Sequence, residues 1–291
     1  MACMNRRDFM KHTAGTLATS LALGGFARPA FGETKFSATA KRPLGKTGIE
    51  CSTLGMGTGT RSWNGSSAQN RQGRKSFVSL LEHAYASGLT YYDLADMYGA
   101  HDYMKDALKN TVKREEVTLL TKTVSREPSL VAADLERFRQ ELNTDHLDIV
   151  LLHCMTDPQW TSKMEGCMDV LSEAKAKGQI RACGVSCHDL NALKLAAETP
   201  WVDVILARIN PFGNKMDGKP EEVAPVLQKA HDNGKGILGM KIVGEGELKD
   251  KIPESLKFVL GLGCVDVFNI GVLQTSEIDA NIASIAAVSL A

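Results

Sequence analysis

The sequence has no excess of either charge and no long hydrophobic run. Its 34 lysines and arginines are balanced by 34 aspartates and glutamates, so the formal net charge is zero. Because nucleic acids and anionic membranes are bound through a concentrated positive field, neither is an expected partner. The mildly apolar stretch at 13–26 is too short for a permanent membrane helix, so no stable membrane span is expected.

Metal-ligand spacings of cysteine are also missing. The seven cysteines are odd in number, and neither a Cys-x-x-Cys pair nor a Cys/His ligand spacing occurs. We therefore expect buried, reduced thiols, no metal site, and no disulfide between Cys183 and Cys187.

The N-terminus resembles an export signal. Arg6 and Arg7 are followed by the apolar stretch 13–26 and then by small residues. This order is similar to a twin-arginine signal. We interpret 1–32 as the signal peptide and 33–40 as a linker. The twin-arginine export machinery is then an expected partner, and the protein is expected to be periplasmic or otherwise exported. A disordered tail with a chance arginine pair is the alternative.

The rest of the chain alternates between strand-like and helix-like segments. Short apolar segments predict eight strands, at 53–57, 90–95, 117–122, 148–153, 181–186, 202–210, 236–241 and 265–271. Between them apolar residues recur at helical spacing, as at Val131, Leu135, Phe138 and Leu142. This alternation predicts an α/β fold, a (β/α)₈ TIM barrel over 41–291.

A glycine-rich dinucleotide turn is absent after the first predicted strand. Its absence weakens the alternative fold, a doubly wound open sheet. Residues 42–51, with Gly45 and Gly48 near the middle, predict a short β-hairpin ahead of the barrel.

Four polar residues lie at or after the ends of neighbouring predicted strands. Asp93 lies on the second strand, Tyr98 in the turn after it, Lys122 ends the third and His153 ends the fourth. Catalytic groups of this fold gather at the carboxyl ends of its strands. Each residue alone has a structural alternative, as a rim aromatic, an ion-pair partner or a core histidine. Together they predict an active site.

The chemistry of these four residues is coherent. A free tyrosine has a pKa of about 10, and a nearby ammonium favours phenolate, so we expect Lys122 to lower the pKa of Tyr98. Asp93 keeps the lysine charged, and a neutral His153 can donate a hydrogen bond to a substrate oxygen. Such a group suits general acid catalysis at a carbonyl that receives a hydride. Because no side chain carries hydride, a nicotinamide cofactor is required.

Four segments resemble motifs of the aldo-keto reductase family. They are the hairpin 42–48, the Asp-to-Tyr-Gly segment 91–99, the lysine strand 120–123 and the histidine strand 148–153. The resemblance runs from about Arg42 to Asn281. It implies that Tyr98 is the acid, that Lys122 and Asp93 tune it, and that His153 orients the carbonyl. The implied substrate is an aldehyde or ketone, or an alcohol in the reverse direction.

The resemblance also implies cofactor contacts. The assigned residues are Gly57, Thr58, Ser186, Cys187, Arg208, Asn210, Met240, Lys241, Gly244, Gly246, Glu277 and Asn281. Ser186 fits a ligand of the nicotinamide carboxamide. Cys187 stands where the family has Asn, Leu206 where it has Gln, and Met240 where an aromatic often stacks.

Other members of this set have different implied roles. Arg208, Asn210 and Lys241 could compensate for the three departures, although the first two could equally be structural polarity at the barrel mouth. Gly244 and Gly246 resemble the family's glycine-containing loop over the pyrophosphate, where glycine permits close backbone approach.

The identity of the nucleotide rests on one position. Asn281 fits an adenine contact, and Glu277 stands near where a basic residue commonly meets the 2′-phosphate of NADP. A carboxylate repels phosphate but accepts from a ribose 2′-hydroxyl, which tilts the choice toward NAD. Lys249 or Lys251 could reverse that preference.

The substrate mouth is expected to be open, and two alternative functions remain. Since the chain ends at Ala291, near the last helix, we expect an open mouth with Trp63 and Trp160 as substrate-facing aromatics, although both could equally be surface packing residues. One rival is a nucleotide-binding barrel that acts as a redox sensor or partner subunit with little turnover. The other is an aldolase or isomerase that uses Lys122 as a Schiff base.

Overall fold

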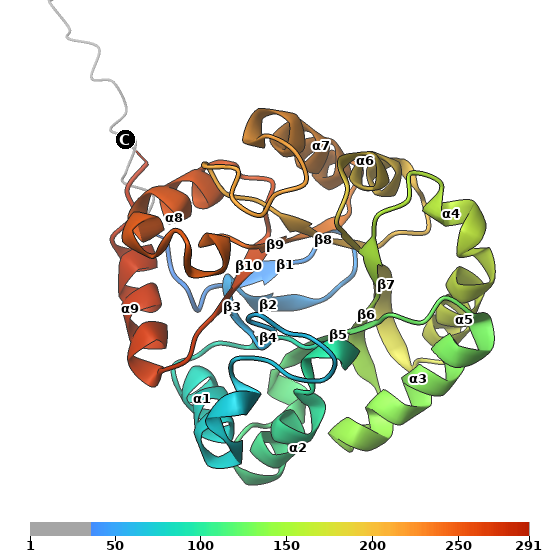
Figure 1. The fold of residues 1–291 in the computed structure, drawn as a ribbon, viewed down its shortest axis with the longest axis horizontal. Helices are drawn as coiled ribbons and strands as arrows, with labels where there is room; N and C mark the ends of the chain where they lie inside the picture. The colour runs from blue at the N-terminus through green and yellow to red at the C-terminus, as the bar shows by residue number, and fades with distance from the viewer. Residues whose placement is uncertain (1–35, 291) are drawn as a thin grey trace, which may run out of the picture. The chain divides into compact units, whose positions relative to one another are not determined.

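The computed structural model describes residues 36–290, and their strands close into a parallel barrel (Figure 1). The barrel strands are β3 Leu54–Gly57, β4 Tyr91–Asp93, β5 Thr118–Thr123, β6 Leu147–Met155, β7 Ile180–Cys187, β8 Val204–Arg208, β9 Gly236–Met240 and β10 Val267–Gly271. They pair in chain order, and β10 returns to β3 to close the barrel.

Helices surround the barrel (Figure 1). They are α1 Arg74–Ala86, α2 His101–Asn110, α3 Pro128–Leu142, α4 Trp160–Lys163, α5 Glu165–Ala176, α6 Leu190–Glu198, α7 Pro220–Asp232, α8 Ile252–Gly261 and α9 Thr275–Ala286. Within 36–290, none of them combines the length and apolarity that crossing a membrane would need.

Barrel side chains divide between an inner and an outer core. Tyr91 and Leu120 pack inside the barrel, whereas their neighbours Tyr92 and Leu119 pack outside against the helices. Successive strand residues point to opposite faces, so residues two positions further on face inward again. This alternation brings Asp93 and Lys122, both at such positions, to the same interior.

A two-stranded hairpin, β1 Lys41–Pro43 with β2 Glu50–Ser52, covers one end of the barrel. Leu44, Ile49 and Cys51 join the inner core, and the Lys46 N–H donates to the Gly234 carbonyl just before β9. Gly45 lies so close to this segment that a Cβ there would be 2.4 Å from the carbonyl carbon of Lys235. With this end filled, the carboxyl ends of the strands form the remaining mouth.

The predicted fold is confirmed, and the open-sheet alternative is wrong because the sheet closes. The strand bounds differ from the predicted ones by one or two residues. For example, β6 does not end at His153 but runs to Met155, through a register shift after Leu152 where Cys154 has a φ of 59°. The predicted export signal lies outside the described residues, and the domain boundaries predicted from it stay predictions.

Candidate active site

A buried lysine and aspartate form the base of the candidate site. Lys122 on β5 is fully buried and Asp93, the last residue of β4, is 4% exposed. The Lys122 ammonium donates to Asp93 Oδ1, to the Leu94 carbonyl at 2.7 Å and to the Tyr98 hydroxyl at 3.4 Å. All three N–H groups of the ammonium therefore have acceptors, which fixes its position.

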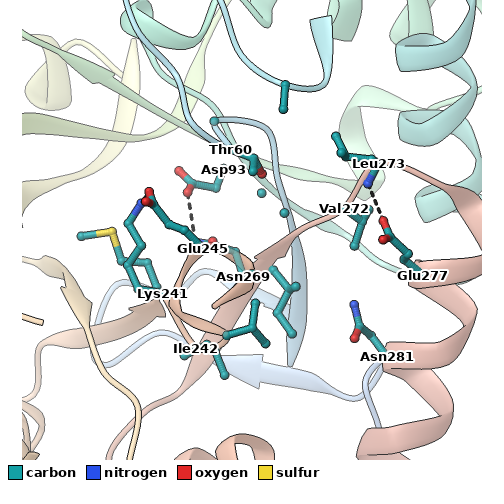
Figure 2. Close-up of a pocket in the computed structure, with 18 of the residues that line it drawn as sticks. Thr60, Asp93, Lys241, Ile242, Glu245, Asn269, Val272, Leu273, Glu277 and Asn281 are labelled. Atoms are coloured by element: carbon teal, nitrogen blue, oxygen red, sulfur yellow. Dashed lines mark hydrogen bonds and ion pairs between the residues drawn. The ribbon is translucent and has the colours of Figure 1, made fainter. Parts of the chain in front are cut away.

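The second oxygen of Asp93 has a partner of its own. Asn269 on β10 donates from Nδ2 to Asp93 Oδ2 at 2.9 Å (Figure 2). The Asp93 backbone carbonyl accepts from both the N–H and the hydroxyl of Thr58. Side chain and backbone of Asp93 are thus both held in place.

Tyr98 lies in the short turn Asp96–Tyr98 after β4. Its carbonyl accepts from Asn70 Nδ2 at 3.0 Å, and Gly99 follows with a φ of 62°. Gly59 makes room for the ring, since a Cβ there would lie 2.5 Å from Tyr98 ring carbons. The Tyr98 ring also packs edge-on against the imidazole of His153, with ring centroids 5.8 Å apart. The structure therefore brings the four predicted catalytic residues together.

Burial controls the protonation of this group. It lowers the pKa of Lys122 and raises that of Asp93, while the opposite charge of each partner counteracts the change in the other. The pKa of Tyr98 is raised well above 10, first by burial and then by the Asp93 charge. The net shift is opposite to the lowering that the sequence predicted, because burial and the Asp93 charge both raise this pKa. The resting hydroxyl is therefore protonated.

His153 and His188 are both neutral at ordinary pH. Burial, with Lys122 as the next contribution, lowers the pKa of His153 to about 2. Burial, with Arg208 next, lowers the pKa of His188 to about 3. A neutral ring at position 153 can donate a hydrogen bond without bringing a charge into the site.

These two histidines predict a loss of stability in mild acid. Their unfolded pKa is about 6.5, so as pH falls the unfolded chain binds protons first. The stability they contribute is complete above pH 6.5 and is lost as pH falls toward 3. Between pH 6.5 and 5 the two together cost about 3 kcal/mol. Urea unfolding at both pH values measures this, and a His153→Gln/His188→Gln variant should depend less on pH. Equal losses in both proteins would contradict the prediction.

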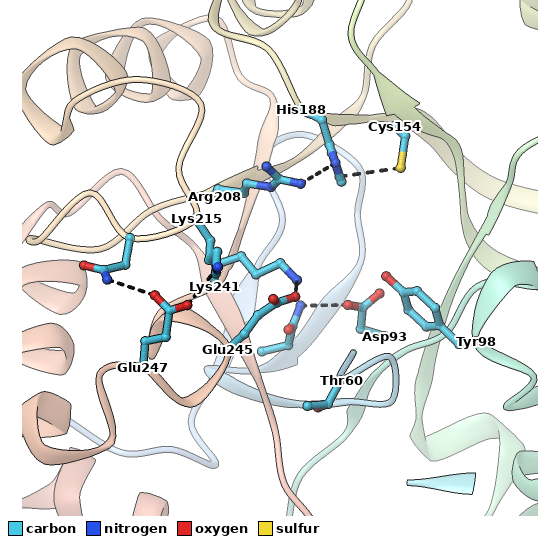
Figure 3. Close-up of polar contacts among 12 residues, drawn as sticks. Thr60, Asp93, Tyr98, Cys154, His188, Arg208, Lys215, Lys241, Glu245 and Glu247 are labelled. Carbon is cyan, nitrogen blue, oxygen red and sulfur yellow. Dashed lines mark hydrogen bonds and ion pairs between the residues drawn. The ribbon is translucent and has the colours of Figure 1, made fainter. Parts of the chain in front are cut away.

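His153, Cys154 and His188 place one potential metal-ligand atom each within 4.8 Å of one another. Arg208, however, donates from Nη2 to Nδ1 of His188, and Cys154 Sγ lies 3.8 Å from its Nε2 (Figure 3). Since Nδ1 accepts, the neutral ring carries its proton on Nε2, facing the thiol. His188 therefore offers a donor, and not a lone pair, on the side of Cys154.

A cleft of about 570 Å³ opens beside Asp93 and Tyr98, a size typical of ligand sites. Of the predicted cofactor residues, those that line it are Gly57, Met240, Lys241, Gly246, Glu277 and Asn281. Figure 2 shows Lys241, Glu277 and Asn281 among its lining side chains. The cleft extends from the interior of β3 and β4 to the first turns of α9.

Some of the predicted cofactor residues do not line this cleft. Cys187 points outward into the core between barrel and helices, because it follows the inward position Ser186. Ser186 Oγ accepts from the Cys154 N–H at 2.9 Å. Asn210 is buried and donates to the Asn214 and Lys241 carbonyls. These contacts give the three residues structural roles.

Thr58, Gly244 and Arg208 are also outside the lining. Thr58 holds the backbone of Asp93 as described, and Gly244 is a buried residue of the turn after β9. Arg208 is held between His188 and Asp217, the latter at 2.9 Å. Asp217 is largely buried, which raises its pKa to about 6 despite the guanidinium.

The two predicted substrate aromatics differ. Trp63 is 75% exposed and does not line the cleft. Trp160 is 1% exposed, packs beside Trp201 and donates from its indole to the Ala192 carbonyl. The prediction that Trp160 faces the substrate was wrong, because its position in α4 turns the indole against α6.

Glu277 has a structural role that the sequence did not reveal. Its carboxylate accepts from the backbone N–H groups of Leu273 and Gln274, which caps α9. Asn269 was missed altogether. Alternation along β10 from the inward-facing Val267 could have found it, since a polar residue two positions on must face the barrel interior.

Fold and site together define a barrel with a buried proton-donor group at the carboxyl end of its strands, beside a cleft of ligand size. The chain belongs to the aldo/keto reductase family, whose model matches residues 53–259.

Curated relatives and solved structures share this similarity. The chain is 24% identical over 220 residues to the NADH-specific methylglyoxal reductase of Escherichia coli, covering 67% of this chain and 64% of that protein. It is 25% identical over 185 residues to an NADP(+) aldo-keto reductase of Schizosaccharomyces pombe, covering 58% and 53%. The match thus spans just under two thirds of the bacterial reductase and about half of the yeast one.

Among solved structures, an aldo-keto reductase from Bacillus halodurans in its holo form has a TM-score of 0.71 at 20% identity, covering 87% of this chain and 93% of that one. A putative aldo-keto reductase from Pseudomonas aeruginosa has a TM-score of 0.72 at 22% identity, covering 87% and 96%. These similarities support the fold.

Proposed function

We propose that the protein is a nicotinamide-dependent oxidoreductase that reduces an aldehyde or ketone to an alcohol, or catalyses the reverse reaction. The observation that carries the proposal is the position of Tyr98. Its hydroxyl lies 3.4 Å from the buried Lys122 ammonium, and its side chain lines the cleft. A proton donor backed by a cation, open to a ligand site, is what carbonyl reduction requires.

The cleft suits an extended nucleotide. Its walls include glycines, among them Gly57 and Gly271, where side chains would narrow the passage. Gly246, at a φ of 94°, permits close backbone approach to a phosphate. Asn281 at the far end is 5% exposed and points its amide into the cleft (Figure 2). The bound cofactor would supply the hydride.

The chain's own residues would handle the proton. Tyr98 donates its proton to the carbonyl oxygen as negative charge develops there. Although its pKa is raised, an alkoxide is a stronger base than a phenolate, so the transfer remains favourable. Lys122 stabilises the phenolate that results, and Asp93 balances the lysine charge. A neutral His153 donates a hydrogen bond that orients the carbonyl.

For the cofactor we propose a preference for NADH, supported by the Glu277 carboxylate at the cleft wall. We expect the full-length chain to bind NADH at least about tenfold more tightly than NADPH, measured by quenching of protein fluorescence. Glu277→Gln keeps the capping contacts and removes the charge, so the difference should narrow. Tighter binding of NADPH would contradict the preference and point to Lys249, which lines the same cleft.

The same protein, mixed with reduced nucleotide and a panel of aldehydes, ketones and quinones, tests the activity. Oxidation of the nucleotide with any carbonyl supports the proposal. Nucleotide binding without oxidation across the panel would favour the sensor. A borohydride-trapped adduct on Lys122 would favour the Schiff-base enzyme, although the three acceptors around its ammonium oppose that chemistry.

We also propose export through the twin-arginine route, supported by Arg6, Arg7 and the apolar stretch after them. Fusing residues 1–40 to a folded reporter tests this proposal. The reporter should leave the cytoplasm, and an Arg6→Lys/Arg7→Lys version should stay. A wild-type fusion that stays would contradict it.

A further inference from the structure

Asn269 and Asp93 lie two strands apart. In the closed barrel β10 pairs with β3, and β3 pairs with β4. Neighbouring strands are about 4.8 Å apart, so β10 and β4 are separated by roughly twice that distance. The 2.9 Å hydrogen bond from Asn269 Nδ2 to Asp93 Oδ2 therefore passes over the interior face of β3.

The interior face of β3 carries only glycines, and one of them leaves room for the Asn269 side chain. Leu54 and Met56 pack in the outer core, so Gly55 and Gly57 hold the inward positions. At Gly55 the ring of Tyr91 fills the space. At Gly57 a Cβ would lie 3.1 Å from Asn269 Oδ1 and 3.0 Å from a backbone nitrogen of β10. A side chain at 57 would press on the amide.

The Asn269 amide gives the second oxygen of the buried Asp93 carboxylate a hydrogen-bond donor. Asp93 Oδ1 accepts from Lys122, and Oδ2 accepts from Asn269. Burial already raises the pKa of Asp93, so a donor to the ionised form opposes protonation. Because the amide is uncharged, it supports the carboxylate without repelling the Lys122 ammonium. Asn269 is only 8% exposed, which shields this contact from water.

We propose that Asn269 is a positioning residue of the reaction, which reaches across Gly57 to hold Asp93 ionised and oriented, and through Asp93 keeps Lys122 charged beside Tyr98. The proposal rests on the proposed carbonyl reductase activity. The residue acts at the end of a hydrogen-bonded chain that joins three barrel strands, from Asn269 through Asp93 and Lys122 to the tyrosine.

Asn269→Leu tests the proposal, since leucine has nearly the same shape and no donor. A hydrogen bond to a charged group stabilises by an amount equivalent to about tenfold or more in equilibrium. We therefore expect kcat to fall about tenfold, with the KM for carbonyl and nucleotide within about twofold of wild type. The acid limb of the pH profile of kcat should move to higher pH by about one unit.

Asn281→Leu is the matched control, because it removes the other amide of the same cleft without touching Asp93. It should raise the KM for nucleotide and leave the acid limb of kcat in place. Asn269→Asp, which keeps the shape and adds a negative charge beside Asp93, should shift the limb further than leucine does. It also serves if the leucine variant fails to fold.

A readout independent of turnover separates this proposal from the proposed function. Carboxyl-labelled aspartate NMR of the nucleotide-free protein, with Asp93 assigned through Asp93→Asn, reports its titration directly. We expect the Asp93 midpoint to rise by about one unit in Asn269→Leu. An unchanged midpoint and an unchanged acid limb would overturn the role of Asn269. A wild-type protein without turnover would overturn the proposed enzymatic activity. The NMR titration would still test the contact between Asn269 and Asp93.

Discussion

Replacing Tyr98 by phenylalanine is expected to lower turnover of any carbonyl substrate by about a hundredfold or more, the usual contribution of a positioned general acid. The variant removes only the hydroxyl, which lies 3.4 Å from Lys122 Nζ. The ring, the Gly59 contact and the cleft remain, so nucleotide affinity and folding should change little. Steady-state rates together with a fluorescence titration of nucleotide binding measure both effects.

Tyr92→Phe is the control for this experiment. It removes a hydroxyl from the middle of β4 on the outer face of the barrel, where the group donates to the Leu81 carbonyl at 3.0 Å. Its stability should fall by about 1 kcal/mol, and its turnover should match wild type. Wild-type turnover in Tyr98→Phe would remove the basis of the proposed mechanism.

Replacing Lys122 by methionine should produce the largest loss of stability of any single change at the site, about 3–5 kcal/mol, because it leaves the Asp93 carboxylate buried without its cation. Lys122 is fully buried and Asp93 nearly so. Urea unfolding measures the loss. Turnover should fall as well, since the phenolate formed at Tyr98 would have no ammonium beside it.

A double variant distinguishes an uncompensated charge from lost packing. Asp93→Asn combined with Lys122→Met removes both charges, so it should recover most of the stability lost in the single variant while remaining inactive. Lys163→Met, which breaks the exposed pair with Asp157, should change stability little. A Lys122→Met protein as stable as wild type would show that the buried pair is not held as an ion pair.

The proposed catalytic group was accessible from the sequence because a barrel places the ends of its strands at one mouth. Once the strands near Asp93, Lys122 and His153 were identified, their convergence followed from topology alone. The period of two along each strand could also have shown that Cys187 faces outward, beside the inward Ser186. The cofactor role predicted for Cys187 rested instead on its position in the family's motif, which does not specify the face of the strand.

Protonation and long-range contacts needed the folded molecule. A raised pKa at Tyr98 depends on how completely neighbours exclude water from the hydroxyl, which no local pattern records. Likewise, the donor on His188 is fixed by Arg208, twenty residues away in the chain. The Glu277 carboxylate serves as a helix cap as well as lining the cleft, and only the turn after β10 reveals this.

By itself the sequence determined the alternation of strands and helices, the closed barrel and the residues at its mouth, because periodicity and strand ends are local properties. Only the tertiary structure decided which of those residues touch. Asn269 reaches Asp93 because barrel closure sets β10 two strands from β4, and because Gly57 leaves room for the amide on the interior face of β3 between them. Contacts of this kind join residues 176 positions apart, so they exist only after the chain has closed on itself.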